Sequence, residues 1–256
     1  MVYKIKKELL YYLKIPIKPI YLWFWEKWEE KKLLMLYSNF IKKGDLVFDI
    51  GANRGRYTKV FRRLGARVIS IEPHPFFIRK LKKKFGKDKN VTIINKGVSG
   101  EKKTINFYEA KRKDSSSFDK KYIEKNDLEV ERSSEVETIP LQELIEKYGA
   151  PSFIKIDVEG FEYEVLKTLD PTRIKALSFE NFADKINFDK IMGLLKKDKD
   201  LEFNISSGSL NAGLQNLFLK KWLNLEDFKE FFKFCFLIKN FNGDVYVRRK
   251  NEAPEI

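Results

Sequence analysis

The chain has 256 residues, of which 43% are hydrophobic and 34% are charged. This length and balance predict one globular domain with a sizeable core and an accessory segment. The single cysteine, Cys235, excludes a disulfide framework and a cysteine zinc site, and its apolar neighbours predict a buried filler. Such cysteine usage suits a reducing compartment, and we read no secretory leader at the start, so we expect a cytoplasmic protein.

The formal net charge is +14, because 51 lysines and arginines outnumber 37 aspartates and glutamates. An excess of this size predicts an anionic neighbour, such as nucleic acid, a membrane surface or a phosphorylated substrate. A solvated, lysine-rich and glutamate-rich surface that serves stability at high temperature explains the charge equally well. Composition leaves both interpretations open.

Residues 1–40 differ in composition from the rest and predict an N-terminal helical segment before a main domain over residues 41–256. Between residues 9 and 28, tyrosines, tryptophans and a phenylalanine alternate with lysines, and Pro16 and Pro19 are expected to break the run. A membrane-spanning helix needs about 20 apolar residues and is not expected. Three uses of the aromatic residues stay open: a lid or core, a membrane-surface contact that would make the protein peripheral, or a homodimer contact.

The hydrophobic pattern alternates strands with helices, as in a doubly wound α/β domain. Strands are expected at 46–50, 67–71, 91–95, 153–157, 176–180, 201–206 and 244–249. Helices are expected near 29–40, 56–64, 75–85, 140–148, 160–168, 187–197 and 225–232. Residues 103–108 and 135–139 predict an antiparallel excursion, and the polar stretch 109–134 between them predicts a mobile loop near the site.

The first strand carries the most informative turn of the chain. Residues 47–50 are apolar apart from Asp49 and end at Gly51, which is typical of a strand buried on both faces. Gly51 and Gly55 bracket a turn that opens an amphipathic segment. The pattern therefore predicts a strand-to-helix crossover whose free backbone amides can hold a ligand.

The charges around this turn distinguish between ligands. A dinucleotide site has the spacing Gly-x-Gly-x-x-Gly, whereas here Asp49 stands two residues before Gly51, where it would repel phosphate and attract an ammonium group. Glu72 closes the next apolar run, at a position from which a carboxylate accepts hydrogen bonds from ribose hydroxyls. A ligand with a ribose, an amino group and no phosphate matches S-adenosylmethionine. The simpler alternative is a strand-to-helix turn that binds no nucleotide, in which Asp49 only caps the turn.

Several stretches together resemble the FkbM family of S-adenosylmethionine-dependent methyltransferases. In chain order they are Phe48–Gly55, Ile71–Pro75, Asn95–Ser99, Ser115–Ser117, Pro140–Leu144 and Phe153–Glu162. The resemblance covers residues 44 to about 182 and fades outside them. It implies a Rossmann-like class I methyltransferase sheet of seven strands, the last one antiparallel, and methylation of oxygen atoms of sugars or other hydroxylated small molecules.

The candidate cofactor-binding residues follow the ends of the first three strands and the motifs of the resemblance. Gly97 and Val98 come after the third strand, where backbone groups and an apolar side chain can hold adenine. The full set is Asp49, Gly51, Ala52, Asn53, Gly55, Tyr57, Glu72, Pro73, His74, Gly97, Val98, Ser117 and Asp157.

Asp157, Glu180 and His74 are the candidate catalytic residues, because a hydroxyl acceptor needs a base. Asp157 is expected at the end of the fourth strand, beside Asp49 at the switch point, where it could hold the ammonium group, take a proton or bind a metal. The plain alternative is that it caps a helix. Glu180 ends the fifth strand. His74, the only histidine, titrates near neutrality, but its place after Glu72 favours contact with adenosine.

A divalent metal would need Asp157, Glu180 and Glu159 as ligands. Strand alternation places Glu159 beyond the strand, so we expect an incomplete ligand set and a metal-independent reaction.

Three classes of function compete. Methylation of a glycan or hydroxylated small molecule is favoured, and the aromatic, basic N-terminus would suit a lipid-linked sugar. RNA methylation is favoured only by charge, since the sequence shows no RNA-binding motif. The third class is a non-catalytic ligand-binding protein with the same fold.

Overall fold

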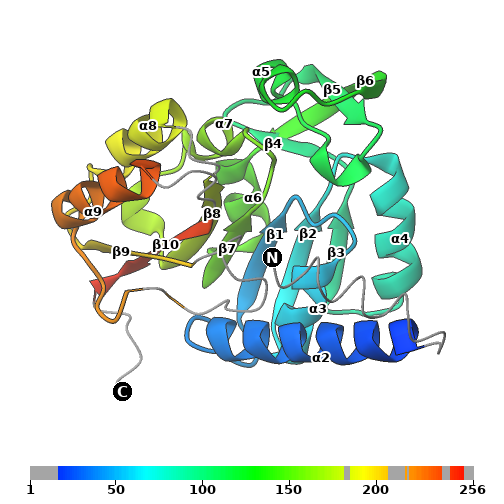
Figure 1. The fold of residues 1–256 in the computed structure, drawn as a ribbon, viewed down its shortest axis with the longest axis horizontal. Helices are drawn as coiled ribbons and strands as arrows, with labels where there is room; N and C mark the ends of the chain where they lie inside the picture. The colour runs from blue at the N-terminus through cyan, green and yellow to red at the C-terminus, as the bar shows by residue number, and fades with distance from the viewer. Residues whose placement is uncertain (1–16, 182–184, 207–216, 218, 238–242, 251–256) are drawn as a thin grey trace.

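The computed structural model describes residues 17–181, 185–206, 217, 219–237 and 243–250, with the side chains of 17–25 and 236–237 left out (Figure 1). Most of the aromatic run between residues 9 and 28 therefore lies outside the described side chains. The lid, membrane-surface and dimer contacts stay predictions.

The described residues form a seven-stranded sheet in the order β3-β2-β1-β7-β8-β10-β9. β10 runs antiparallel to both of its neighbours, and the other pairings in this sheet are parallel. The prediction of a doubly wound sheet with an antiparallel last strand is confirmed. The strands are β1 (Leu46–Ile50), β2 (Arg67–Ile71), β3 (Val91–Ile94), β7 (Phe153–Ile156), β8 (Ala176–Asn181), β9 (Leu201–Ile205) and β10 (Gly243–Arg249).

β1 lies between β2 and β7 and is buried along its whole length. Its last residue, Ile50, pairs with Ile71 of β2 and Ile156 of β7. Because parallel strands in register end together, the turns after these three strands meet at one edge of the sheet. This edge is where open α/β sheets bind ligands.

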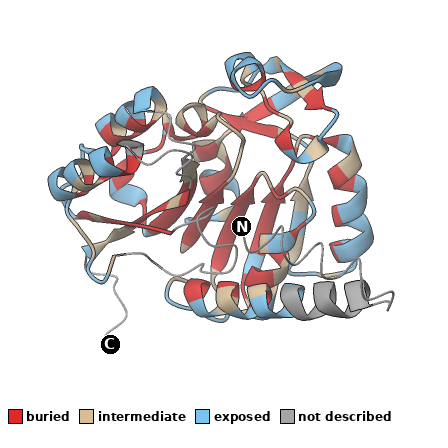
Figure 2. Ribbon diagram, viewed as in Figure 1, coloured by how far each residue is buried: buried red, intermediate tan, exposed pale blue. Residues whose placement is uncertain are grey.

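Helices cover both faces of the sheet, and burial is concentrated between the layers (Figure 2). One face packs against α6, α7, α8 and α9, and the other against α2 and α3. The helices are α2 (Ile17–Tyr37), α3 (Arg56–Arg63), α4 (Pro75–Phe85), α5 (Lys120–Lys125), α6 (Leu141–Tyr148), α7 (Glu162–Leu166), α8 (Lys185–Leu195) and α9 (Leu225–Leu237), with 3-10 turns η1 (Lys113–Ser115) and η2 (Pro171–Arg173).

α2 corrects one expectation about the N-terminal segment. Pro19 lies inside the helix rather than breaking it. It falls in the first turn, where the missing N–H has no partner within the helix to lose. The other end of α2 is anchored, because Leu33 and Tyr37 pack in one cluster with Phe61 of α3 and Phe153 of β7.

None of the described helices combines the length and apolar character needed to cross a bilayer.

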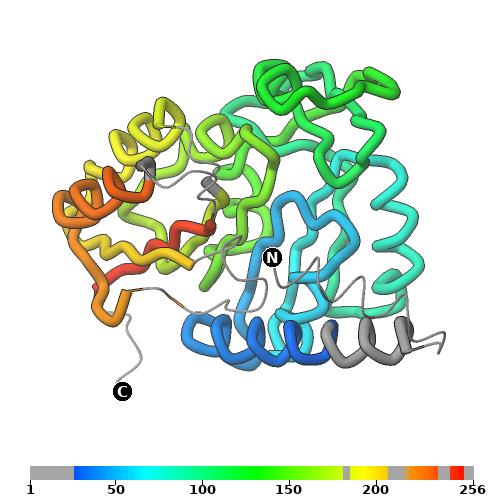
Figure 3. The backbone as a smooth tube through the Cα atoms, in the orientation of Figure 1, coloured from blue at the N-terminus to red at the C-terminus, as the bar shows by residue number. Residues whose placement is uncertain are grey.

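A smaller sheet, in the order β4-β6-β5, lies above the strand ends (Figures 1 and 3). It consists of β4 (Gly97–Ser99), β5 (Thr104–Ala110) and β6 (Val130–Pro140), and β5 and β6 are antiparallel as predicted. The stretch 109–134, expected as an irregular loop, instead contains η1, α5 and much of β6. Asp119 starts α5 by accepting a hydrogen bond from the Lys121 amide at 2.8 Å. The mobility of this stretch stays a prediction.

Candidate functional site

A cavity lies at the carboxyl ends of β1, β2 and β7, and residues of the smaller sheet and of η1 form part of its wall. It brings together many of the predicted cofactor residues. They are Gly51, Asn53, Glu72, Pro73, His74, Gly97, Val98 and Asp157.

The Glu72 carboxylate is held by two backbone amides. Its Oε2 accepts from the Asn53 amide and its Oε1 from the His74 amide, both at 2.8 Å. Asn53 has φ 49°, a left-handed conformation that asparagine tolerates better than most residues. Burial raises the pKa of Glu72 to about 7. Each oxygen keeps a lone pair for the hydroxyls of a ribose.

The floor of the cavity is made of backbone, and glycine is needed there. Gly51 has φ +79°, and a Cβ at this position would lie 1.8 Å from the carbonyl oxygen of Asp157. At Gly97 a Cβ would lie 2.5 Å from the Phe118 ring. Any side chain at either position would clash with the cavity wall. This steric restriction explains why glycine occupies both positions better than turn geometry alone does.

The His74 ring is 2% exposed and packs edge-on against Phe77 and Phe107. Its Nδ1 accepts from the Phe76 amide at 3.4 Å and lies 3.6 Å from a carboxylate oxygen of Glu109. Its Nε2 has no hydrogen-bond partner among the described residues. Burial lowers the pKa of His74, so the neutral ring is favoured.

These features fit the adenosine part of S-adenosylmethionine. Glu72 is placed for the ribose, while the unpartnered His74 Nε2 and the apolar side chains of Ile71, Phe77 and Val98 suit a flat heterocycle. His74 is not part of the carboxylate cluster described below. Its placement matches the predicted adenosine contact better than a role as base.

Three predicted cofactor residues lie behind the cavity wall rather than in it. Asp49 is fully buried, its Oδ2 accepts from the Thr58 hydroxyl at 2.5 Å, and burial raises its pKa to about 6. Ala52 is buried among residues of α4. Gly55 has φ +71°, and a Cβ there would lie 2.5 Å from the Phe85 ring. These three residues support the turn from behind the cavity wall. Their position in the sequence motif predicted contact with the cofactor, but they do not line the cavity.

Tyr57 and Ser117 also lie outside the cavity lining. Tyr57 packs edge-on against Tyr37 on the far face of the sheet, at a ring distance of 5.9 Å. The Ser117 hydroxyl donates to the Glu159 carbonyl at 2.7 Å and accepts from the Asp119 amide at 2.9 Å. Ser117 therefore connects the stretch before α5 to the turn after β7, and its neighbour Ser116 lines the cavity instead.

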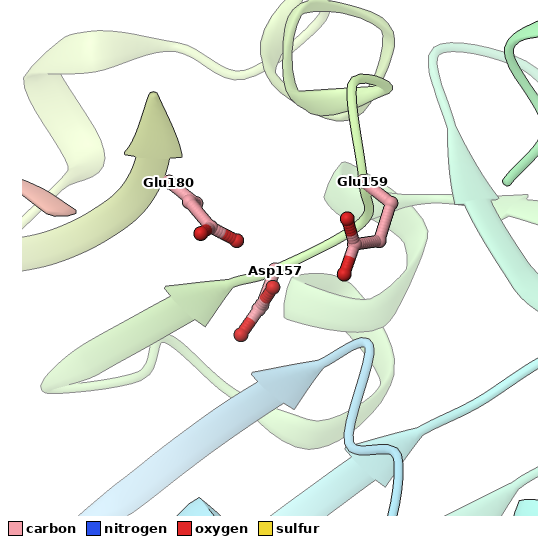
Figure 4. Close-up of side chains that lie close together, drawn as sticks. All are labelled: Asp157, Glu159 and Glu180. Carbon is pink, nitrogen blue, oxygen red and sulfur yellow. The ribbon is translucent and has the colours of Figure 1, made fainter. Parts of the chain in front are cut away.

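Three carboxylates converge beside this cavity (Figure 4). Asp157, Glu159 and Glu180 each offer an oxygen, and these oxygens lie within 4.8 Å of one another. We call this group the carboxylate cluster. Glu159 lies beyond β7 as expected, since the strand ends at Ile156, but the expectation of an incomplete ligand set was wrong. The chain turns through left-handed conformations at Glu159 (φ 53°) and Gly160 (φ 93°), and the Glu159 carboxylate lies beside the other two. The three oxygens could hold a hard divalent cation.

Lys155 is a feature of the site that the sequence reading missed. It is fully buried, and its Nζ lies 3.2 Å from Asp244 Oδ1 and 3.5 Å from Asp157 Oδ2. Burial alone would lower the pKa of Lys155, but the two carboxylates raise it well above its usual value. The buried ammonium therefore stays charged and fixes Asp157. A lysine within an otherwise apolar strand was the available signal.

The carboxylate cluster retains protons near neutral pH. Burial and the Asp157 charge raise the pKa of Glu159 to about 8, although the Tyr122 hydroxyl donates to its carboxylate. Burial and the same charge raise the pKa of Glu180 well above its usual value. Such groups can take up and release protons at physiological pH.

The strand order, the single antiparallel strand and a cavity at the switch point define a class I methyltransferase. The family model for the Methyltransferase FkbM domain matches residues 49–205, which is more than half of the chain. The chain belongs to the FkbM methyltransferase family and is an S-adenosylmethionine-dependent methyltransferase.

Several solved structures are similar to this chain at low identity. An rRNA methylase from Streptococcus thermophilus is 9% identical with a TM-score of 0.45, over 86% of this chain and 93% of that one. Precorrin-6y C5,15-methyltransferase from Geobacter metallireducens is 11% identical with a TM-score of 0.43, over 86% and 88%. A Streptococcus mutans protein in complex with SAH is 12% identical with a TM-score of 0.41, over 93% and 99%. No curated protein matches the chain.

Proposed function

We propose that this methyltransferase transfers the methyl group to a hydroxyl oxygen of a sugar, a glycan or another hydroxylated small molecule. The observation that carries the proposal is the carboxylate cluster, which lies beside the cofactor cavity and includes Asp157 in the cavity wall, where a carboxylate can take the proton of a hydroxyl. A nitrogen or thiolate acceptor would depend less on such a group.

The bound cofactor supplies a methyl group already activated on a sulfonium. The protein must align the acceptor and remove its proton, since a neutral hydroxyl is a weak nucleophile. The bond from oxygen to methyl forms as the bond from sulfur to methyl breaks, and the hydroxyl proton passes to a carboxylate. Asp157 receives it, and the Lys155 ammonium, 3.5 Å from Asp157 Oδ2, holds that carboxylate in place.

Labelled methyl transfer tests this proposal. A cell extract separated into lipid, glycan, RNA and protein is incubated with the enzyme and a carbon-13 methyl donor, and the products are examined by NMR. We expect label in the chemical-shift range of methyl ethers in the glycan or lipid fraction. Label on nitrogen or carbon would overturn oxygen methylation, and label confined to RNA would support the second function class, which the charge of +14 favours.

We further propose that the reaction needs no metal, although the three carboxylates lie close together. Two of them, Glu159 and Glu180, have raised pKa values, and a protonated carboxyl is a poor metal ligand. Turnover is expected to be the same with and without EDTA. Loss of turnover in EDTA with recovery in magnesium would contradict this expectation.

A further inference from the structure

A second cavity lies between α5, the turn after β7 and α8. Its wall includes Tyr122, Gly160 and Glu180, and three lysines, Lys121, Lys125 and Lys190, also line it. The first cavity draws on the ends of β1 and β2, and none of its lining residues recurs in the second. The two cavities are therefore separate binding volumes.

The carboxylate cluster lies between the two cavities. Asp157 and Glu159 line the first cavity, and Glu180 lines the second. The Tyr122 side chain lines the second cavity while its hydroxyl donates to Glu159. A hydroxyl that enters through the second cavity therefore meets the carboxylates with the cofactor cavity behind them. Displacement in line needs this arrangement, with the acceptor and the donor on opposite sides of the transferred group.

The second cavity offers positive charge that the protein does not itself neutralise. Among the residues that the structure describes, neither Lys121 nor Lys190 takes part in a salt bridge. The Lys190 ammonium lies 5.3 Å from the centre of the Tyr163 ring, an attraction that leaves its charge intact. Ammonium groups without a carboxylate partner at a cavity wall are suited to bind an anion.

The acidic residues of this cavity accept hydrogen bonds from backbone amides or belong to the carboxylate cluster. The Asp119 carboxylate accepts from the Lys121 amide as the cap of α5. Glu162 is 1% exposed and accepts from the Gly160 amide at 3.2 Å, and burial raises its pKa to about 7. Glu180 belongs to the carboxylate cluster. Lys121 and Lys190 therefore face one ionised cap, Asp119, and two carboxyls whose pKa values are raised, Glu162 and Glu180.

We propose that the second cavity binds the methyl acceptor, and that the acceptor carries an anionic group, a phosphate or a carboxylate, near the hydroxyl that is methylated. Lys121 and Lys190 would hold the anion while the hydroxyl reaches Glu180 and Asp157. This inference rests on the proposed function, because it assigns the acceptor of the same reaction.

Calorimetry with three related sugars tests the inference. The protein is first saturated with S-adenosylhomocysteine and then titrated with glucose 6-phosphate, glucuronate or glucose. We expect at least one of the two charged sugars to bind about tenfold more tightly than glucose, as a charge-assisted hydrogen bond implies. The two charged sugars distinguish a phosphate from a carboxylate.

The variant K121A/K190A is expected to reduce the affinity for the preferred charged sugar to that for glucose and to leave S-adenosylhomocysteine affinity unchanged. Lys120→Ala is the matched control, because Lys120 lies on the same helix, pairs with Glu124 and does not line the cavity. Equal affinity for glucose, no binding of either charged sugar, or an unchanged affinity in the double variant would overturn the inference. Failure of the proposed function would appear separately, as label on nitrogen or carbon.

Discussion

The two sides of the site are built by different means. The cofactor side consists largely of backbone: glycines without room for a Cβ, and amides that hold Glu72. The acceptor side consists of side chains, with the carboxylate cluster and the lysines of the second cavity. Backbone geometry suits a ligand common to a whole class of enzymes. Side chains are replaced without refolding the sheet, so the acceptor side is where members of one fold diverge.

The largest effect is expected from Asp157→Asn, which removes a carboxylate at the boundary of the two sides. Turnover should fall by about 10²–10⁴-fold, the usual contribution of a positioned base. S-adenosylhomocysteine affinity, measured by calorimetry, should fall far less. The control is Asp244→Asn, which removes the other carboxylate beside Lys155 without altering the lining of either cavity.

Equal losses of turnover and of cofactor affinity in Asp157→Asn would contradict the division between the two sides. Asp157 would then be a cofactor ligand rather than a catalytic group.

The next effect is expected from Gly51→Ala, which tests the backbone side. Its Cβ would lie 1.8 Å from the carbonyl oxygen of Asp157, so β1 and β7 would have to separate. The free energy of unfolding should fall by about 3 kcal/mol or more, and cofactor binding should be lost. Gly44→Ala is the matched control, because Gly44 has φ +91° and no atom within 4 Å of its Cβ.

Gly44→Ala should cost only about 1–2 kcal/mol for its left-handed backbone. Denaturant unfolding of both variants measures the difference, and equal losses of stability would show that steric contact at Gly51 is unimportant.

A smaller effect is expected from Glu72→Gln, which keeps the shape of the side chain but turns one acceptor into a donor. S-adenosylhomocysteine affinity should fall about tenfold. The pKa of Glu72 is about 7, so the affinity of the unmodified protein should also fall as the pH drops from 8 to 6, when the carboxylate becomes protonated. Calorimetry across this range should show a flatter profile for the variant, and Glu137→Gln, at an exposed site, should change neither quantity.

The last effect concerns the free energy of unfolding of the protein without a ligand. Burial raises the pKa of Asp49 to about 6 and that of Glu162 to about 7, so the folded protein binds more protons than the unfolded chain between about pH 4 and pH 7. By linkage, the free energy of unfolding falls as the pH rises through this window. His74, whose pKa burial lowers, opposes this trend as a single group.

We expect the urea midpoint to fall between pH 5 and pH 8. Asp49→Asn should reduce the slope. A midpoint that rises with pH would contradict the assigned burial of these carboxyls.

The sequence alone determined the sheet and the cofactor turn. The pattern of apolar residues along each strand is a local signal, and it predicted the positions of β1, β2 and β7. The glycines after β1 mark a turn, and together with the end of β2 they predicted the cavity residues Gly51 and Glu72. The structured stretch between β5 and β6 escaped prediction, because its short elements depend on the Asp119 cap and on Ser117, which bonds to Glu159 across the fold.

Only the tertiary structure decided the acceptor side. Glu159 was expected beyond the end of the strand and outside the ligand set, but two left-handed residues, Glu159 and Gly160, bring its carboxylate beside Asp157. Lys155 of β7 contacts Asp244 of β10, which lies 89 residues later in the chain. The second cavity lies between α5 and α8, which are also far apart in the sequence. Contacts of this kind depend on how the chain turns and which distant segments meet, and a local pattern of apolar and polar residues carries no information about either.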